Sequence, residues 1–278
     1  MAWTLTSDLE EFRARAGAFL RADPVRNTVA LTVTEAMRKQ GPGPSEGALF
    51  GWWPRDGGVA ATVLWAGAHP PLLSAMPDET ARDLADALAA RGATARGVDG
   101  TPGAAEAFAR AWTGRTGTAS RVVMRQRLYR LDRLEAPGPP PDGAARVAGD
   151  ADRDLVLDWF AQFHRDAGDH GEVDTALIDG RLRAGGVLLW EAGGRPVAMA
   201  GRTQAVGGMA RVAPVYTPAG HRRRGYGAAV TAAATRNAQN AGASEVVLFT
   251  DLGNPTSNGV YRRIGYRPVE DRVVLAFT

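Results

Sequence analysis

The hydrophobic positions along this chain follow two spacings. In some stretches they recur every three or four residues, which is typical of one face of a helix, and in others they alternate or run on without a break, which is typical of strands. In the first half, a capping signal at residues 7–10 opens the first helix and Asp56-Gly57-Gly58 joins two strands into a hairpin. Helices are predicted at about 7–21, 29–40, 78–91 and 103–112, and strands at 48–53, 59–65, 95–98 and 120–131.

The second half of the chain continues with the same two spacings. Strands are predicted near 146–147, 187–191 and 196–206, then up to Thr217, and at 245–250, 266–269 and 272–277. Helices are predicted at 152–165 and 174–183, from Gly225 to Gly242, and from a cap at Ser257 to Ile264. The run at 245–250 is continuously apolar, which predicts a strand that is covered on both faces.

The clearest break in the chain lies at residues 136–142, which read Ala-Pro-Gly-Pro-Pro-Pro-Asp. Prolines make such a segment a stiff linker. A chain of 278 residues also suits two domains of ordinary size. We therefore predict an N-terminal domain at 1–135, a linker at 136–142 and a C-terminal domain at 143–278.

The most informative stretch joins the strand that ends at Thr217 to the long helix. Residues 222–227 read Arg-Arg-Arg-Gly-Tyr-Gly, so arginines and glycines stand together at a helix N-terminus. That end of a helix carries partial positive charge and normally attracts Asp or Glu. Arginines in this place indicate that an anion docks on the free N–H groups, and glycines allow the anion to approach closely. The stretch predicts a loop that binds phosphate.

The composition excludes several functional classes. The chain has no cysteine, which excludes disulfides, thiolate metal sites and a cysteine nucleophile, and its four histidines lack metal-ligand spacing, so no metal is expected. A net charge of +3 is weak support for a nucleic-acid partner. No apolar stretch is long enough to span a membrane and the N-terminus does not resemble a signal peptide, so a cytoplasmic protein without a membrane partner is expected.

Two other phosphate-binding motifs fit the loop less well. A dinucleotide fingerprint could begin at Gly225 and Gly227, with Asp251 as its acidic residue, but it would leave the arginines without a role. Val230 also stands near the place where its third glycine is needed. A Walker loop requires Gly-Lys-Ser/Thr, which does not follow here.

Three motifs in order give residues 143–278 a resemblance to the GNAT acetyltransferase superfamily. Residues 222–227 are similar to that family's (Gln/Arg)-x-x-Gly-x-(Gly/Ala) coenzyme A loop. Residues 215–218, Val-Tyr-Thr-Pro, look like the end of its central strand, and residues 254–266 resemble its closing motif. The predicted order of strands and helices agrees with that family as well.

The resemblance implies an α/β (α+β) fold with two GNAT-like domains, each a mixed, mostly antiparallel central sheet flanked by helices. The first half of the chain repeats the order of elements in outline. At residues 72–79, where its loop would lie, it has no glycine and an acidic helix start, which is the ordinary way to satisfy a helix dipole. We therefore expect a degenerate N-terminal domain that packs against the catalytic domain and lines the substrate cleft.

The resemblance also implies acetyl-CoA as the donor of the acetyl group. Pro214, inside a strand pattern, indicates a bulge, and in the family the central strand diverges from its neighbour near this point. The expected contacts of the coenzyme are Val215, Tyr216, Thr217, Arg222, Arg223, Arg224, Gly225, Tyr226, Gly227, Ala228, Asn254, Ser257 and Tyr261.

Two residues are implied to act in catalysis. The backbone N–H of Val215 would donate to the thioester carbonyl, and Tyr261 would protonate the departing thiolate. Tyr261 is alternatively a core aromatic, and Asn254 alternatively shapes the loop before Pro255. The family has no fixed general base. Glu191 is the first candidate for that role, and the alternatives are Glu172, His164, His170 and a chain of water molecules.

The acceptor is expected to be the primary amine of a small molecule, such as an amine, an amino acid or a related metabolite. Its pocket would form from the helices at 152–183, the loop at 170–172 and Trp52 with Trp53, which are alternatively core aromatics. Direct transfer in a ternary complex is the leading hypothesis. The alternatives are a module that senses coenzyme A without turnover, and an acyltransferase acting on a protein or a tRNA-linked substrate. A monomer and a homodimer both fit.

Overall fold

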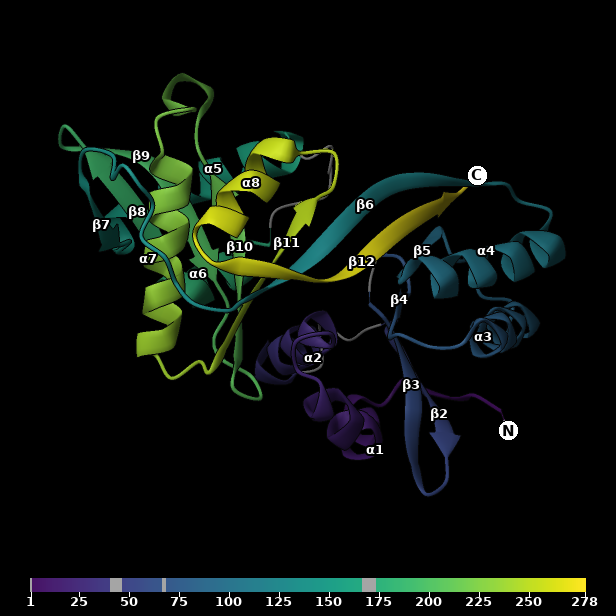
Figure 1. The fold of residues 1–278 in the computed structure, drawn as a ribbon. Helices are drawn as coiled ribbons and strands as arrows, with labels where there is room; N and C mark the ends of the chain where they lie inside the picture. The colour runs from purple at the N-terminus through teal and green to yellow at the C-terminus, as the bar shows by residue number, and fades with distance from the viewer. Residues whose placement is uncertain (1, 41–46, 67–68, 167–173) are drawn as a thin grey trace. The chain divides into compact units, whose positions relative to one another are not determined.

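The computed structural model describes residues 2–40, 47–66, 69–166 and 174–278, and Figure 1 shows the course of the chain. The chain forms two compact units. Unit 1 comprises Met1–Leu128, Thr250–Gly253 and Val269–Thr278, and unit 2 comprises Tyr129–Phe249 and Asn254–Pro268. The division of the sequence into domains at the linker 136–142 stays a prediction.

Unit 1 contains a sheet in which β1–β5 are neighbours in chain order, followed by β12 and β6. Helices α3 and α4 bury their apolar residues in one core with Val98 of β5, and α1 contacts β2 and β3. The strands are β1 (Thr4–Thr6), β2 (Leu49–Arg55), β3 (Gly58–Trp65), β4 (Leu72–Leu73), β5 (Gly97–Gly100) and β6 (Ser120–Leu131). The helices are α1 (Leu9–Ala22), α2 (Thr28–Gln40), α3 (Asp78–Ala90) and α4 (Pro102–Thr116).

Unit 2 contains a sheet in the order β11-β10-β9-β8-β7, in which only the β10–β11 pair is parallel. Its strands are β7 (Ala144–Val147), β8 (Val187–Ala192), β9 (Arg195–Arg202), β10 (Met209–Tyr216) and β11 (Glu245–Asp251). Its helices are α5 (Arg153–Asp166), α6 (Thr175–Arg183), α7 (Tyr226–Asn240) and α8 (Pro255–Arg263), with short 3₁₀ turns η2 (Asp150–Asp152) and η3 (Ala219–His221).

The last strand, β12 (Tyr266–Phe277), contributes to both units. Its residues from Val269 onward belong to unit 1, where Val273–Ala276 pair antiparallel with β5. Val273 and Leu275 join the apolar core of α3 and α4. The C-terminal segment of the chain therefore completes the sheet of the N-terminal unit, which the spacing of hydrophobic residues did not predict.

Two apolar clusters cover the two faces of the unit 2 sheet. Ala210 and Val212 of β10 pack with Tyr226, Val230 and other residues of α7. On the opposite face, Tyr216 packs with residues of α5 and α6. Figure 1 shows α7 on one side of β8–β10 and α5 and α6 on the other. Because side chains alternate along a strand, neighbours on β10 serve different helices.

The helix caps correct two sequence predictions. Asp8, rather than Ser7, caps α1, because its carboxylate accepts from the N–H groups of Glu10 and Glu11. Asn254, rather than Ser257, caps α8, because its side-chain oxygen accepts from the Ser257 N–H at 3.0 Å. Both side chains have the short reach that an N-cap requires.

Two strand predictions were also wrong in extent. The strand predicted at 196–206 ends at Arg202, and the pair predicted at 266–269 and 272–277 is the single strand β12. The confirmed fold is α/β with mixed, mostly antiparallel strands flanked by helices. Among the described residues, no helix is both long and apolar enough to cross a bilayer.

Candidate functional site

The end of β10 lies beside a break in the sheet of unit 2. β10 pairs with β11 at Met209–Arg211 and, among the described residues, no further. Against β9 its register shifts between Val212 and Val215, so the bulge predicted from Pro214 is confirmed. A bulge leaves backbone groups outside the ladder and bends the strand. Val215 pairs with Ala200 of β9 directly after the bulge, and it lies beyond the last residue of β10 that pairs with β11.

The bulge is held from both sides. A Cβ at Gly201 of β9 would lie 2.7 Å from the Ala213 carbonyl oxygen, so only glycine lets β9 run this close. The Arg181 guanidinium of α6 donates to the same oxygen at 2.8 Å. Arg181 also lies over the Phe160 ring, 5.7 Å from its centroid. These contacts fix the backbone just before Val215.

The loop between β10 and α7 carries the predicted phosphate-binding residues. Gly225 is the N-cap of α7 in the left-handed region, at φ 83°, and no side chain caps the helix. The first helical hydrogen bond runs from the Ala229 N–H to Gly225, which leaves the N–H groups of residues 226–228 ahead of the helical ladder. The first turn has no acidic residue. An anion would satisfy both the free N–H groups and the dipole.

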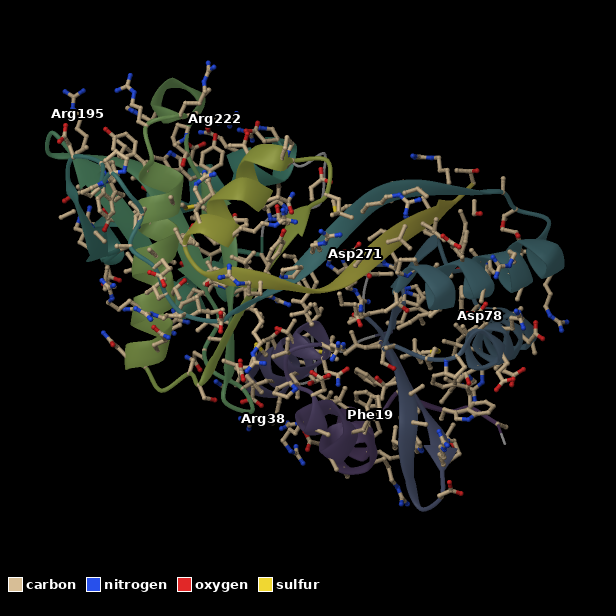
Figure 2. The ribbon with its side chains drawn as sticks, viewed as in Figure 1. Phe19, Arg38, Asp78, Arg195, Arg222 and Asp271 are labelled. Carbon is tan, nitrogen blue, oxygen red and sulfur yellow. The ribbon has the colours of Figure 1, made fainter. Side chains whose placement is uncertain are left out.

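The three arginines of the loop differ in their surroundings. Arg222 donates to the Thr217 carbonyl at 2.9 Å and pairs with Asp166 of α5 at 2.5 Å, so it braces the loop (Figure 2). Arg223 and Arg224 are exposed and have no ion-pair partner in the part of the chain that the structure describes. Of the three, Arg223 and Arg224 are therefore the ones whose charge is available to a phosphate.

Two further details of the loop fit a ligand at this place. A Cβ at Gly227 would lie 3.4 Å from the Thr217 hydroxyl, so a larger side chain would crowd the end of β10. The Nδ1 atom of His221, in the turn before Arg222, is buried without a hydrogen-bond partner among the described residues. Buried polar atoms are normally paired, so an orphan beside the loop indicates a missing partner.

Tyr261 of α8 is both a core residue and a candidate acid. Its residue surface is 8% exposed, and its ring contacts Tyr266 edge to face at 6.3 Å. Burial raises the pKa of Tyr261 to about 12. Among the described residues, its hydroxyl has no hydrogen-bond partner. The hydroxyl oxygen does not belong to the polar side-chain atoms that are fully buried without a partner. A phenol of this kind remains protonated at neutral pH and is free to donate.

The motif around α8 is organised by asparagines. Asn254 caps the helix, and its carbonyl accepts from the Asn258 side chain at 2.8 Å. The Asn258 side-chain oxygen in turn accepts from the Tyr129 hydroxyl at 2.9 Å. The loop-shaping role that was the alternative for Asn254 is thus present in the structure. Ser257 supplies a backbone N–H to that cap, and a coenzyme contact of either residue stays a prediction.

The predicted general bases lie in several places. Glu191 of β8 is ion-paired with Arg146 at 3.0 Å, and Arg146 also holds Asp152 at 2.6 Å. A guanidinium at this distance stabilises the charged carboxylate and occupies one of its oxygens. His164 lies on α5 with its ring edge to face with Phe163. His170 and Glu172 lie outside the described residues.

The corresponding loop of unit 1 is built differently. β4 leads through Pro77 into α3, whose first turn carries Asp78 and Glu79. Where β4 ends, Arg272 of β12 donates to the Leu73 carbonyl at 3.1 Å and to the Asp99 carboxylate at 3.0 Å. Asp78 and Glu79 thus balance the partial positive charge at the start of α3. The carbonyl at the end of β4 already accepts a hydrogen bond from the Arg272 guanidinium of the same unit.

Of the two tryptophans proposed for the acceptor pocket, only Trp52 has a core position in unit 1. Trp52 is 7% exposed, as the core alternative predicts. Trp53 is half-buried and lies edge to face with Trp3 at 5.8 Å. Within the described ranges, no group of His, Cys, Asp and Glu has the geometry to hold a metal ion.

Several residues of the site were not singled out from the sequence. Arg181 and Arg211 lie on the α5–α6 side of β10, and Gln162 of α5 accepts from the Tyr216 hydroxyl at 2.7 Å. Asp166 anchors Arg222. Arg211 alone carried a signal in the sequence, because it is a charged residue inside an apolar strand pattern. The others depend on which faces of the helices meet the sheet.

A comparison with protein-family models finds one match. Residues 153–266 match the acetyltransferase (GNAT) family, a range that runs from the start of α5 to the start of β12. It includes the bulge, the loop before α7 and Tyr261. No curated protein matches the sequence.

Solved structures with a similar fold cover most or nearly all of the chain. A GCN5-related N-acetyltransferase from Kribbella flavida is 26% identical with a TM-score of 0.55, covering 78% of this chain and 86% of that one. One from Sphaerobacter thermophilus is 18% identical with a TM-score of 0.62, covering 98% and 94%. A tandem GNAT protein from the clavulanic acid biosynthesis pathway is 14% identical with a TM-score of 0.50, covering 83% and 82%.

Proposed function

We propose that this chain, whose residues 153–266 form a GNAT acetyltransferase domain, moves the acetyl group of acetyl-CoA to the primary amine of a small molecule. The family makes the chain an N-acetyltransferase. The acceptor class, the direct transfer in a ternary complex and the roles of individual residues are our proposal. Its principal support is the joint presence of a bulge directly before Val215 and a helix start that has no side-chain cap and follows exposed arginines.

The coenzyme would be held mainly by its phosphates. The N–H groups of residues 226–228 and the side chains of Arg223 and Arg224 supply donors and positive charge at one helix end. Gly225 and Gly227 keep the backbone accessible to a phosphate. Arg222, braced by Asp166, holds the shape of the loop.

The reacting groups would meet beside the bulge of β10. The N–H of Val215 would donate to the thioester carbonyl oxygen as negative charge develops on it. Bound acetyl-CoA supplies an activated acyl carbon, to which a C–N bond forms as the C–S bond breaks. Arg181 acts on this geometry indirectly, because it fixes the Ala213 carbonyl two residues before Val215.

Tyr261 would assist the departing sulfur. The pKa of Tyr261, raised to about 12 by burial, keeps the phenol in its donating form. Because a thiol has a pKa of about 8.5, the phenol holds its proton more tightly than the thiol does. A hydrogen bond to the developing thiolate is therefore the assistance that this pKa favours, and Tyr261 keeps its proton. The proton that the amine loses as the C–N bond forms balances the one that the sulfur gains, so the products are the amide and free coenzyme A.

Unit 1 would have a supporting role. We propose that it is a GNAT-like unit that does not hold coenzyme A at its own β4–α3 connection. Asp78 and Glu79 already satisfy the helix end there, and Arg272 occupies the carbonyl of Leu73.

The decisive experiment combines binding with turnover. Calorimetry with acetyl-CoA is expected to show one site per chain, and release of free thiol is expected with at least one member of a broad panel of primary amines. Absence of both binding and thiol release would overturn the proposal. Binding without turnover for any amine would instead favour a module that senses coenzyme A. Steeply salt-dependent RNA binding would favour a tRNA-linked substrate.

A further inference from the structure

Two arginines of unit 2 lie on the α5–α6 side of the sheet, away from the loop before α7. Arg211 is on β10, between Ala210 and Val212, which face α7, so its side chain points to the opposite face. Arg181 extends from α6 to the same face and donates to the carbonyl of Ala213, which is two residues along β10 from Arg211. The two guanidinium groups are thus brought to one stretch of β10.

Among the described residues, no carboxylate forms an ion pair with the guanidinium of Arg181 or of Arg211. The charge of Asp174 favours the protonated form of Arg181. One carboxylate oxygen of Asp174, however, caps α6 by accepting from the Leu177 N–H. Burying like charges together without a counter-ion is unfavourable, and proteins normally pair such groups.

The surroundings make this pair unusual among the arginines of the chain. Burial lowers the pKa of Arg181 to about 10, and burial together with the charge of Arg181 lowers that of Arg211 to about 10. Both residues nevertheless keep part of their surface accessible. A charged group that is surrounded by protein and still accessible is placed to meet a ligand.

The buried Arg202 provides a contrast. It is 6% exposed, and on β9 it donates to the Asn237 side chain of α7 at 2.5 Å, on the other face of the sheet. A second hydrogen bond goes to the Thr203 carbonyl. Arg202 therefore has a structural role that accounts for its burial. Arg181 and Arg211 have no ion-paired carboxylate in the described ranges, and the hydrogen bond from Arg181 to the Ala213 carbonyl does not balance their charge.

We infer that Arg181 and Arg211 bind a carboxylate of the amine acceptor, so that the acceptor is an ω-amino carboxylate. This inference rests on the proposed acetyl transfer at Val215. Arginine suits the role because its planar donors match the two oxygens of a carboxylate.

The length of the acceptor follows from positions along β10. At about 3.3 Å per residue, a regular strand would place Arg211 ~13 Å from Val215, where the amine would attack, and the bulge between Val212 and Val215 shortens this separation. A straight or lightly branched chain between the amine and the carboxylate lets the carboxylate meet the Arg211 guanidinium while the amine stays at Val215.

The test compares matched acceptors with matched variants. Rates of thiol release are measured for ω-amino carboxylates of increasing chain length and for the corresponding amides, with the native protein, Arg211→Met and Arg202→Met. The native protein is expected to prefer a carboxylate over its amide by about 10- to 100-fold in kcat/KM, the range for a hydrogen bond to a charged group. Arg211→Met is expected to abolish the preference and to leave acetyl-CoA affinity unchanged, and Arg202→Met to retain the preference.

Thermal unfolding distinguishes an arginine that binds a ligand from one that stabilises the fold. Arg211→Met removes an uncompensated charge and is expected to raise Tm or leave it unchanged, whereas Arg202→Met breaks a hydrogen-bonded network and is expected to lower it. The inference would be overturned if the native protein acetylated the amide as fast as the carboxylate. It would also be overturned if the Arg211→Met variant kept the preference for the carboxylate.

A second arm separates this inference from the proposed function. The same ω-amino carboxylates are titrated into each protein by calorimetry, with inorganic phosphate as a competitor. If no acceptor is acetylated, carboxylate binding that is lost in Arg211→Met still supports the anion site, while its absence in the native protein refutes it. Binding of phosphate in preference to the carboxylates would also refute the carboxylate assignment.

Discussion

At the scale of single residues, Tyr261 is a core residue to which we also assign a role in the proposed chemistry. Its ring packs with Tyr266 and the apolar residues of α7 and α8, and its hydroxyl has no partner among the described residues. The same burial that stabilises the ring raises the pKa of the phenol.

Replacing Tyr261 with Phe should separate these two roles. The ring is retained, so stability should change little, and kcat should fall about 10- to 100-fold because a hydrogen bond to the developing thiolate is lost. Acetyl-CoA affinity, measured by calorimetry, should be unchanged. Since the pKa of Tyr261 is about 12, the native rate should show no loss attributable to this group up to about pH 11. A variant with native kcat would remove Tyr261 from the mechanism.

Asp99 of unit 1 provides a prediction on stability. Burial raises the pKa of Asp99 above its ordinary value of 3.8, against the opposing effect of Arg272, and burial likewise raises the pKa of Glu270 above 4.5. At these two carboxyls the folded chain therefore holds more protons than the unfolded chain between the ordinary and the raised pKa values. Their contribution to stability should decrease as the pH rises through that window, because linkage favours the state that holds the proton.

The measurement for Asp99 is urea unfolding at a series of pH values above about 4. Asp99→Asn cannot titrate, so its stability should decline less with rising pH than that of the native protein. Asp271, whose pKa is lowered by its hydrogen bond to Arg127 (Figure 2), provides the control. Asp271→Asn should leave the decline above pH 4 in place. Parallel curves for native protein and Asp99→Asn would contradict this account.

At the scale of elements, the start of α7 differs from the start of α3. α3 begins with Asp78 and Glu79, whereas α7 begins with a glycine cap and follows exposed arginines. Both helices follow a strand of their unit, so the same local geometry carries opposite charges. The difference explains why only one of the two connections is suited to phosphate.

The arginines of the loop should therefore respond differently to substitution. Replacing both Arg223 and Arg224 by Ala should weaken acetyl-CoA binding by roughly 10-fold or more and reduce its dependence on salt, because two phosphate-directed charges are removed. Arg222→Ala should chiefly loosen the loop, and Asp166→Asn should reproduce part of that effect. Calorimetry at two salt concentrations distinguishes these outcomes. Equal losses for Asp166→Asn and the double variant would argue against distinct roles.

At the scale of the whole molecule, the C-terminal residues Val269–Thr278 belong to unit 1. Residues of β12 pair with β5 and fill the core formed by α3 and α4. Val273 is fully buried and Leu275 is 6% exposed, while Val274 between them faces the other side and is half-buried. The stability of the N-terminal unit thus depends on residues from the C-terminus.

Substitutions in β12 should show this dependence. Leu275→Ala leaves a cavity in unit 1 and should cost about 2–5 kcal/mol, with loss of hydrogen-exchange protection in β5, α3 and α4. Val274→Ala, on the other face, should cost less. A loss of protection confined to unit 2 after Leu275→Ala would contradict the assignment of this strand.

The sequence by itself determined the local elements, the bulge and the placement of residues 222–227 at the start of a helix. Hydrophobic spacing and turn residues predicted the helices and strands within a few residues, because both depend on contacts between near neighbours. Residues 222–227 and Pro214 predicted an anion-binding helix start and a bulge, since glycine, proline and charge at a helix end act locally. Short caps were misplaced by one or a few residues, because adjacent polar side chains compete for the same N–H groups.

Only the tertiary structure decided which distant residues meet. The pairing of β12 with β5, the brace from Asp166 to Arg222 and the approach of Arg181 to Arg211 all join segments that are far apart in the chain. Such contacts depend on which faces of sheets and helices pack together, and a local pattern does not encode that choice. The prediction of acetyl-CoA as the donor therefore came from the sequence, whereas the pair of arginines on which the proposed acceptor rests became visible only in the fold.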